Sequence, residues 1–163
     1  MSAARALRHL ATPSWAVRRV FDEAALREVE HAIATTERSH GGEIRFAVEG
    51  NLSPAELWNG VTPRRRAIEV FAQLGVWDTA ANNGVLIYLS WADRDVEIVA
   101  DRGYNERVSP QQWAGICATM EHLFAAGHPV QAIVEAINAV GILIAQHYPA
   151  VDRNELPDRP VVL

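Results

Sequence analysis

The sequence predicts an α/β domain in which a small mixed β-sheet is flanked by helices on both faces, with elements in the order α-β-α-β-β-α-α. Two observations carry this prediction. Residues 82–108 (NNGVLIYLSWADRDVEIVADRGYNERV) contain two apolar runs of strand length around a short polar turn, which is typical of a β-hairpin. Capping residues followed by proline, at Thr62-Pro63 and Ser109-Pro110, indicate helix starts on either side of that hairpin.

The domain is predicted to begin with a helix and a strand. Asp22 can cap the free amides of a helix start, and apolar residues then recur at helical spacing, so we expect a helix over residues 23–39. The helix ends at His40-Gly41-Gly42. Apolar residues occupy every second position of residues 43–49 (EIRFAVE), which predicts a strand.

A crossover helix connects this strand to the hairpin. The capping threonine and proline start a helix over residues 62–74, which a glycine terminates. Strand 84–91 is almost continuously apolar, as expected of a central strand that is covered on both faces. Strand 95–100 follows after a short turn and is therefore its antiparallel neighbour. If strand 43–49 lies parallel to strand 84–91, the crossover should be right-handed.

Two apolar helices complete the domain, at residues 110–126 and 129–146. The second carries a long apolar run that Glu135 and Asn138 interrupt. Its uncharged part is shorter than the roughly 20 residues that a bilayer span needs. We therefore expect a core helix and no direct membrane span.

The segments outside this domain differ from it in composition. Residues 1–20 form a basic arm with Arg5, Arg8, Arg18 and Arg19 and no acidic residue, and they lack the continuous apolar core of a secretory signal. This arm is either a partly ordered lead-in or an amphipathic segment that contacts anionic lipid or a partner. The domain proper covers 21–148, and 149–163 is expected to be an extended, proline-rich tail.

Composition excludes several classes of function. The net charge of −5 argues against nucleic-acid binding. All fifteen basic residues are arginine, so a Schiff-base or P-loop lysine is excluded, and no motif for an organic cofactor is present. Cys117 is the only cysteine, which excludes an internal disulfide and suits the cytoplasm. It lies in an apolar helical pattern and is expected to be a buried structural thiol.

The predicted topology brings three loops to one rim of the sheet. The antiparallel hairpin places Asn82 and Asn83 beside Asp101 and Arg102, and a parallel first strand adds Glu43 to this rim. Carboxylate, carboxamide and carbonyl oxygens suit a hard cation such as calcium. The set Asn82, Asn83, Asp101 and Glu43 is therefore a candidate metal site. Asn and Gly are also what tight turns use, so turn geometry alone is the alternative.

Two further clusters of charge are predicted. The opposite rim should gather polar and aromatic residues that follow or precede the strands, namely Glu49, Asn51, Trp91, Asp93 and Asp95. Arg64, Arg65 and Arg66 lie in the first turn of the crossover helix, which is unfavourable for the helix dipole. Either they bind an anionic ligand or partner or, as we expect, they form a solvated face or pair with acidic neighbours.

Residues Asn83–Gly103 resemble the TPM domain family of bacterial and thylakoid-lumen proteins, in its short stand-alone bacterial branch. The resemblance rests on Asn83-Gly84 before an apolar strand, Asp93-Arg94 at the turn, a second strand and the loop glycine Gly103. It implies a mixed sheet between helices. It also implies calcium binding or acid phosphatase activity, with carboxylates near the strand ends, and roles in membrane-associated assembly. The sequence differs from the family pattern at Asn82, where an acid is common, and after the third strand.

Three hypotheses of function follow. The first is a non-enzymatic binding or assembly module that binds a protein partner and a divalent cation at the rim. The second is a metal-assisted phosphatase that uses Asp101 and Glu43 and holds phosphate with Arg102. The third is a membrane-peripheral adaptor that depends on the basic arm.

Overall fold

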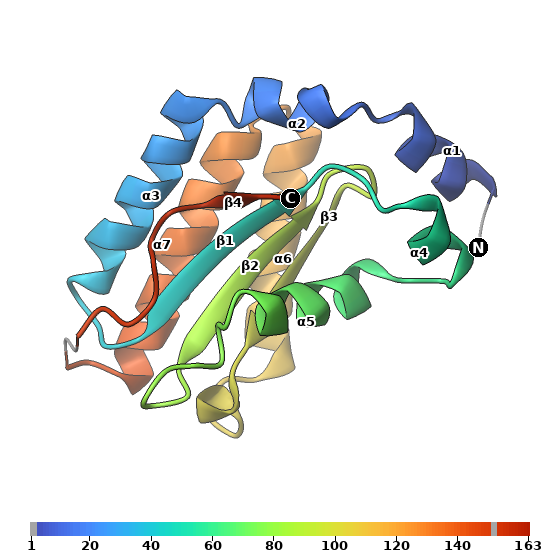
Figure 1. The fold of residues 1–163 in the computed structure, drawn as a ribbon. Coiled ribbons are helices and arrows are strands. Elements are labelled where there is room, and N and C mark those ends of the chain that lie inside the picture. The colour runs from blue at the N-terminus through green and yellow to red at the C-terminus, as the bar shows by residue number, and fades with distance from the viewer. Residues whose placement is uncertain (1–2, 151–152) are drawn as a thin grey trace.

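A computed structural model describes residues 3–150 and 153–163 of the chain. It contains a four-stranded sheet with helices on both faces (Figure 1), which confirms the predicted fold class. In chain order the elements are α1 (Ala3–Ala11), α2 (Ser14–Val20), α3 (Glu23–Glu37), β1 (Glu43–Glu49), α4 (Pro54–Trp58), α5 (Pro63–Gln73), β2 (Gly84–Ser90), β3 (Asp95–Ala100), a 3₁₀ turn (Arg102–Tyr104), α6 (Pro110–Ala125), α7 (Pro129–His147) and β4 (Val161–Val162).

The sheet has the strand order β3-β2-β1-β4. β1 and β2 are parallel, with Glu43 opposite Gly84, and β2 and β3 are antiparallel, with Ser90 opposite Asp95. The predicted hairpin and parallel pairing are therefore confirmed. β4 pairs with β1 through Val161 and was not predicted, because a two-residue strand is too short to show a periodicity.

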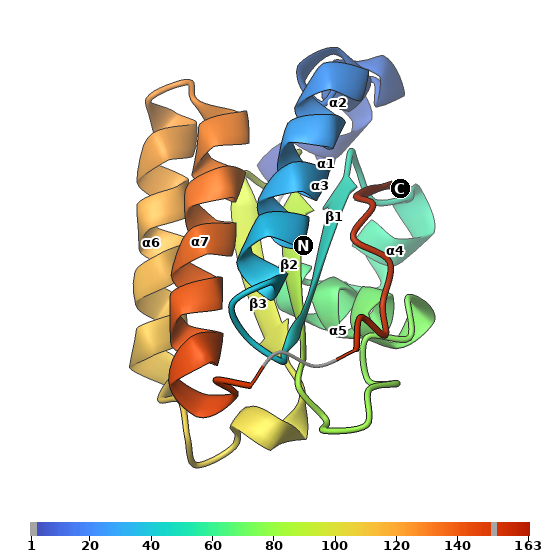
Figure 2. The ribbon, with the colours of Figure 1, turned by 90° about the vertical axis from the view of Figure 1, so that its left-hand side faces the viewer.

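Each face of the sheet has its own core. α3, α6 and α7 lie side by side over one face (Figure 2), where Phe46, Ile87 and Ile98 share one core with buried residues of these helices. α5 covers the other face, where Leu86 and Tyr88 pack against residues of the helix. Because β2 sends side chains into both cores, its apolar run is continuous, as the sequence analysis inferred.

The basic arm is helical and packs on the domain. α1 and α2 are separated at Pro13, and Val17 and Phe21 are buried in the core of the α3 face. The described part of the tail, 153–163, runs beside β1 to reach β4 (Figure 1). Both flanking segments therefore contact the sheet domain.

α7 is, within the described residues, the one helix long and apolar enough to cross a membrane on length and composition alone. Eight of its residues are buried in the protein, including Ile133, Ile137 and Ile144. Burial of this kind is what a core helix shows.

Candidate functional site

The amino rim of the sheet, where β1 and β2 begin and β3 ends, brings together the three predicted loops. The amide of Glu43 donates to the Asn83 carbonyl at 3.3 Å, and the amide of Asp101 donates to the Gly84 carbonyl at 2.9 Å. The amide of Gly103 donates to the Asn82 carbonyl at 2.8 Å. Backbone pairing thus holds all of the candidate residues on adjacent strand ends.

Turn geometry accounts for part of this sequence pattern. Asn82 has a φ of 52°, in the left-handed region that asparagine tolerates. A Cβ at Gly84 would collide with the Val76 carbonyl, and one at Gly103 would collide with the Asn82 carbonyl and the Tyr148 hydroxyl. These glycines therefore allow the three backbones to pack closely at the rim.

Glu43 faces the C-terminal tail. One carboxylate oxygen accepts the Glu155 amide at 3.1 Å and the other accepts the Leu156 amide at 3.0 Å. Burial raises the pKa of Glu43, while these two amide bonds oppose the rise. The carboxylate is therefore an anchor for the tail, which the sequence analysis did not foresee because the two segments are more than a hundred residues apart.

Two other candidates carry buried oxygens that have no partner among the described residues. Asp101 uses Oδ1 to accept the Arg102 amide at 2.7 Å, whereas its Oδ2 is buried and receives no hydrogen bond from residues 3–150 or 153–163. The amide nitrogen of Asn83 donates to the Gly41 carbonyl at 2.6 Å, and its Oδ1 is likewise buried without a donor in the described part of the chain. A buried acceptor that lacks a donor costs free energy unless something else binds it.

Arg102 and Asn82 pair with each other at the surface. Nε of Arg102 donates to Oδ1 of Asn82 at 2.8 Å, and the Arg102 side chain is exposed. Across residues 3–150 and 153–163, His, Cys, Asp and Glu side chains nowhere form a group of three or more that could hold a metal ion. A cation at this rim would consequently depend on carboxamide and backbone oxygens as well as on carboxylates.

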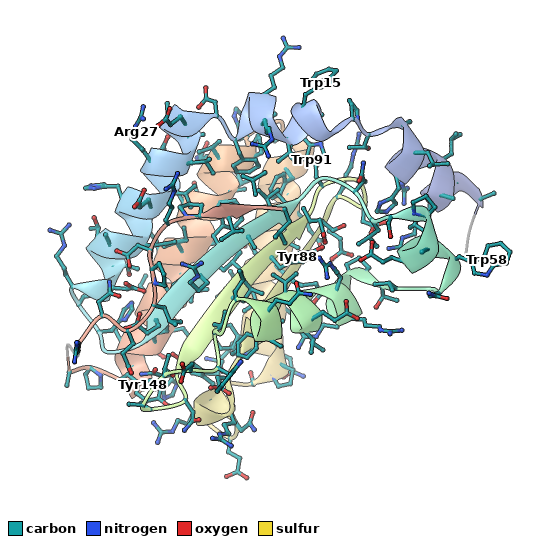
Figure 3. All side chains as sticks on the ribbon, viewed as in Figure 1. Trp15, Arg27, Trp58, Tyr88, Trp91 and Tyr148 are labelled. Atoms are coloured by element: carbon teal, nitrogen blue, oxygen red, sulfur yellow. The ribbon has the colours of Figure 1, made fainter. Side chains whose placement is uncertain are left out.

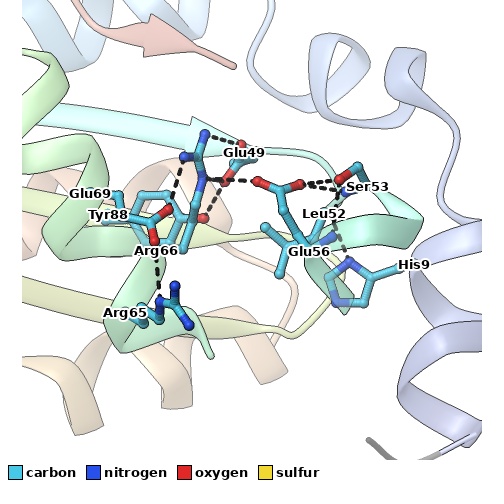
Figure 4. A network of polar contacts seen from close by, with 9 residues as sticks. All are labelled: His9, Glu49, Leu52, Ser53, Glu56, Arg65, Arg66, Glu69 and Tyr88. Carbon is cyan, nitrogen blue, oxygen red and sulfur yellow. Dashed lines mark hydrogen bonds and ion pairs between the residues drawn. The ribbon is translucent and has the colours of Figure 1, made fainter. Parts of the chain in front are cut away.

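The carboxyl rim, where β1 and β2 end and β3 begins, has a different chemistry (Figure 4). Glu49 ends β1 and receives two bonds of 2.8 Å from the guanidinium of Arg66 on α5. The hydroxyl of Tyr88 donates to the same carboxylate at 2.6 Å. Both partners of the ion pair are nearly buried, with side chains 13% and 10% exposed. The bond to Glu49 raises the pKa of Arg66, and burial raises that of Tyr88.

The basic arm supplies a second buried ion pair at this rim. Arg5 on α1 donates to both oxygens of Asp93 at 2.7 and 2.8 Å. His9 accepts the Leu52 amide at Nδ1, so Nε2 carries the proton and faces Asp93 at 3.1 Å. Burial pushes the pKa of Asp93 upward, but the bonds from Arg5 and His9 outweigh it and hold the pKa at about 2.

The predicted pairing of the three neighbouring arginines with acids is confirmed. Arg64 contacts Glu97, and Arg65 contacts Glu69 along α5, while Arg66 binds Glu49. Glu49 and Asp93 lie on this rim as predicted. The sequence did not indicate that Arg66 would bind Glu49, or that Arg5 and His9 would bind Asp93. The available signal was an acidic residue at the end of an otherwise apolar strand. This signal does not identify the residue that pairs with the acid.

The protein is of the α/β class. Its mixed sheet has a closely packed amino rim that glycines line. The family model of the TPM domain matches residues 17–142. The chain belongs to the TPM domain family, which confirms the resemblance seen in the sequence.

Solved structures agree with this assignment. The NMR structure of BA42 from the psychrophilic bacterium Bizionia argentinensis is 29% identical, covers 86% of this chain and 93% of its own, and has a TM-score of 0.73. The N-terminal domain of a P. gingivalis protein is 17% identical, covers 77% of this chain and 94% of its own, and has a TM-score of 0.50, which shows a shared fold alone. Among curated proteins, none matches the chain.

Proposed function

We propose that this protein is a non-enzymatic binding module of the cytoplasm whose amino rim binds a divalent cation, calcium foremost. The observation that carries the proposal is a pair of buried acceptors for which the described residues supply no donor, Oδ1 of Asn83 and Oδ2 of Asp101. Calcium takes carboxylate, carboxamide and carbonyl oxygens, all of which this rim supplies. The family resemblance points to the same chemistry.

The four candidate residues contribute unequally to this proposal. Asp101 supplies the charge and Asn83 the carboxamide oxygen, and neither group must break a hydrogen bond to do so. Asn82 would first release Arg102, and Glu43 would first release the two tail amides. We therefore assign Asp101 and Asn83 the leading roles and give Asn82 and Glu43 secondary ones.

Calcium titration of the full chain tests this assignment. A bound cation should raise the thermal midpoint by mass action, and Asp101→Asn should abolish the rise while Glu43→Gln keeps most of it. Asp78→Asn is the matched control, because Asp78 is an exposed aspartate on the loop before β2. A flat response of the unmodified protein to millimolar calcium would reject the site.

The hydrolase alternative uses the same rim. Asp101 lies beside the exposed Arg102, which could neutralise a phosphate. Turnover of a generic phosphate ester that requires a divalent ion and disappears in Asp101→Asn would establish this alternative. Calcium binding without turnover would leave the binding module as the function.

A specific observation favours a membrane-peripheral role as a second candidate. α1 docks through Arg5 and His9, which leaves its opposite, apolar face outward, with Leu7 67% and Leu10 69% exposed. Trp15 and Trp58 also project away from the domain (Figure 3). An apolar helix face beside exposed arginines suits the surface of an anionic bilayer.

Co-sedimentation with anionic vesicles tests the second candidate. Leu7→Glu/Leu10→Glu should abolish pelleting, because both side chains would then carry charge into the acyl boundary. Ile142→Glu is the control, since Ile142 is equally exposed, at 65%, but lies on α7. Equal pelleting of all three proteins would remove the membrane role.

A further inference from the structure

A groove runs along the outer edge of the sheet, between β3 and α6. β3 is the last strand in the order β3-β2-β1-β4, so within the described ranges no strand pairs with its outer edge. α6 lies along this side of the sheet (Figure 2). The groove between strand and helix has a volume of about 610 Å³ and opens to solvent.

The register decides which backbone groups face the groove. The amide of Asp101 donates to Gly84 on β2, so every second residue of this strand turns its N–H and C=O toward β2. The intervening residues turn theirs outward; these are Val96, Ile98 and Ala100. Outward N–H and C=O groups on an edge strand form a template for an added strand.

Two side chains lie against the backbone at the centre of this edge. Arg64 donates to the Ile98 carbonyl at 2.6 Å, and the thiol of Cys117 lies near the Ile98 amide. Burial raises the pKa of Cys117 to about 11, so the thiol stays protonated. Arg64 is 52% exposed, and solvent can readily replace its contact. An incoming strand could therefore displace the Arg64 side chain from the Ile98 carbonyl at the middle of the edge.

The two walls of the groove differ in chemistry. On the α6 side, Ile98 and Val108 belong to the core, and Trp113 packs against it. The lining also holds four carboxylates and one arginine, from Asp95, Glu97, Asp101, Glu121 and Arg64. Burial, together with the nearby Glu97 and Glu121 charges, raises the pKa of Asp95 to about 6. The carboxylates thus repel one another and lack enough cations.

We propose that this groove binds an extended segment of a partner protein, in which arginine or lysine alternates with apolar residues, as an additional strand on β3. Successive side chains of a strand point to opposite faces. Those on the α5 side would meet Asp95 and Glu97, and those on the α6 side would meet Ile98 and Trp113. The proposal does not require a bound cation: Asp101 belongs both to the groove lining and to the cation site, but the contacts proposed here are with Asp95, Glu97, Ile98 and Trp113.

A synthetic peptide of alternating arginine and valine, blocked at both ends and fluorescently labelled, is the probe. Anisotropy with the full chain should show micromolar binding. Asp95→Asn/Glu97→Gln/Glu121→Gln should weaken it about tenfold through the loss of three partly exposed charge pairs. The triple change Glu23→Gln/Glu28→Gln/Asp78→Asn alters net charge equally at exposed sites outside the groove lining and should leave binding unchanged.

Two further measurements separate strand addition from simple charge attraction. Arg64→Ala should tighten binding, because it frees the Ile98 carbonyl and removes the one cationic side chain among the described residues that line the groove. The peptide should also slow hydrogen exchange at the Val96 and Ala100 amides, and peptide N-methylated at alternate residues should bind at least tenfold more weakly.

The proposal fails if the probe does not bind at millimolar concentration, if both triple variants weaken binding equally, or if N-methylation has no effect. Self-association that the peptide does not displace would instead assign the groove to a second copy of the chain. If the triple variant does not fold, Glu97→Gln alone keeps the test, since its side chain is 23% exposed.

Discussion

The two rims of the sheet differ in how their buried polar groups are paired. At the carboxyl rim, Glu49 and Asp93 each receive a two-pronged arginine contact, and their oxygens are matched by donors. At the amino rim, Asn83 and Asp101 each keep one buried oxygen that has no partner within the part of the chain that the structure describes. A carboxylate that is paired with donors joins distant elements. A buried acceptor without a donor is instead stabilised when a cation binds it.

The proposed cation site lies at the opposite end of the sheet from the usual location of ligand sites. In open α/β sheets, ligands generally bind outside the carboxyl ends of the parallel strands. Here Arg66 from α5 and Arg5 from α1 close that position with ion pairs. The acceptors proposed to bind a cation lie instead at the amino ends of β1 and β2. The backbone groups proposed to bind a partner strand lie along the outer edge of β3.

The largest expected effect comes from breaking the matched rim. Arg66→Ala leaves the Glu49 carboxylate buried beside Tyr88 without its cation, and we expect a loss of about 3 kcal/mol in the free energy of unfolding. Denaturant unfolding measures this loss. Arg65→Ala removes an exposed pair on the same helix and should change stability by less than about 1 kcal/mol. Similar losses in both variants would mean that the Glu49 pair is not specially buried.

A smaller effect, with a defined pH dependence, is expected at Asp93. Its folded pKa of about 2 lies below its ordinary value of 3.8, so the ionised form is stabilised by folding. That contribution is complete above pH 4 and disappears as the pH falls toward 2. Asp93→Asn should therefore cost about 2 kcal/mol at pH 7 and much less near pH 2. A cost that stays constant with pH would contradict the ion pair with Arg5.

The smallest expected effect is an increase in stability, at Asp95. It contrasts Asp95 with Asp93 on the same rim. No arginine in the described ranges forms an ion pair with Asp95, and its folded pKa of about 6 lies above 3.8. Its ionisation therefore reduces stability as the pH rises from 4 to 6. Asp95→Asn should stabilise the protein by about 1 kcal/mol at pH 7, after allowance for solvent screening, and should have little effect at pH 4. Destabilisation at pH 7 would show that Asp95 has a cationic partner.

Much of the fold could be predicted because its signals are local. The caps at Thr62 and Ser109 and the apolar run of β2 each depend on neighbouring residues. The hairpin turn then places Asn83 beside Asp101 without further information. β4 could not be predicted, because two residues carry no period and the strand exists only through its pairing with β1.

The sequence by itself determined the element order, the mixed sheet and the loops that share the amino rim, since cap chemistry, periodicity and turn length encode these features. Tertiary structure alone decided where the charges go. It directed Glu43 to the tail and paired Asp93 with Arg5 across 88 positions of the chain. It also left Asp101 with a buried oxygen that no described residue contacts through a hydrogen bond. The physical reason is that a charge binds whichever partner folding brings within a few ångströms, and that partner leaves no mark in the local sequence.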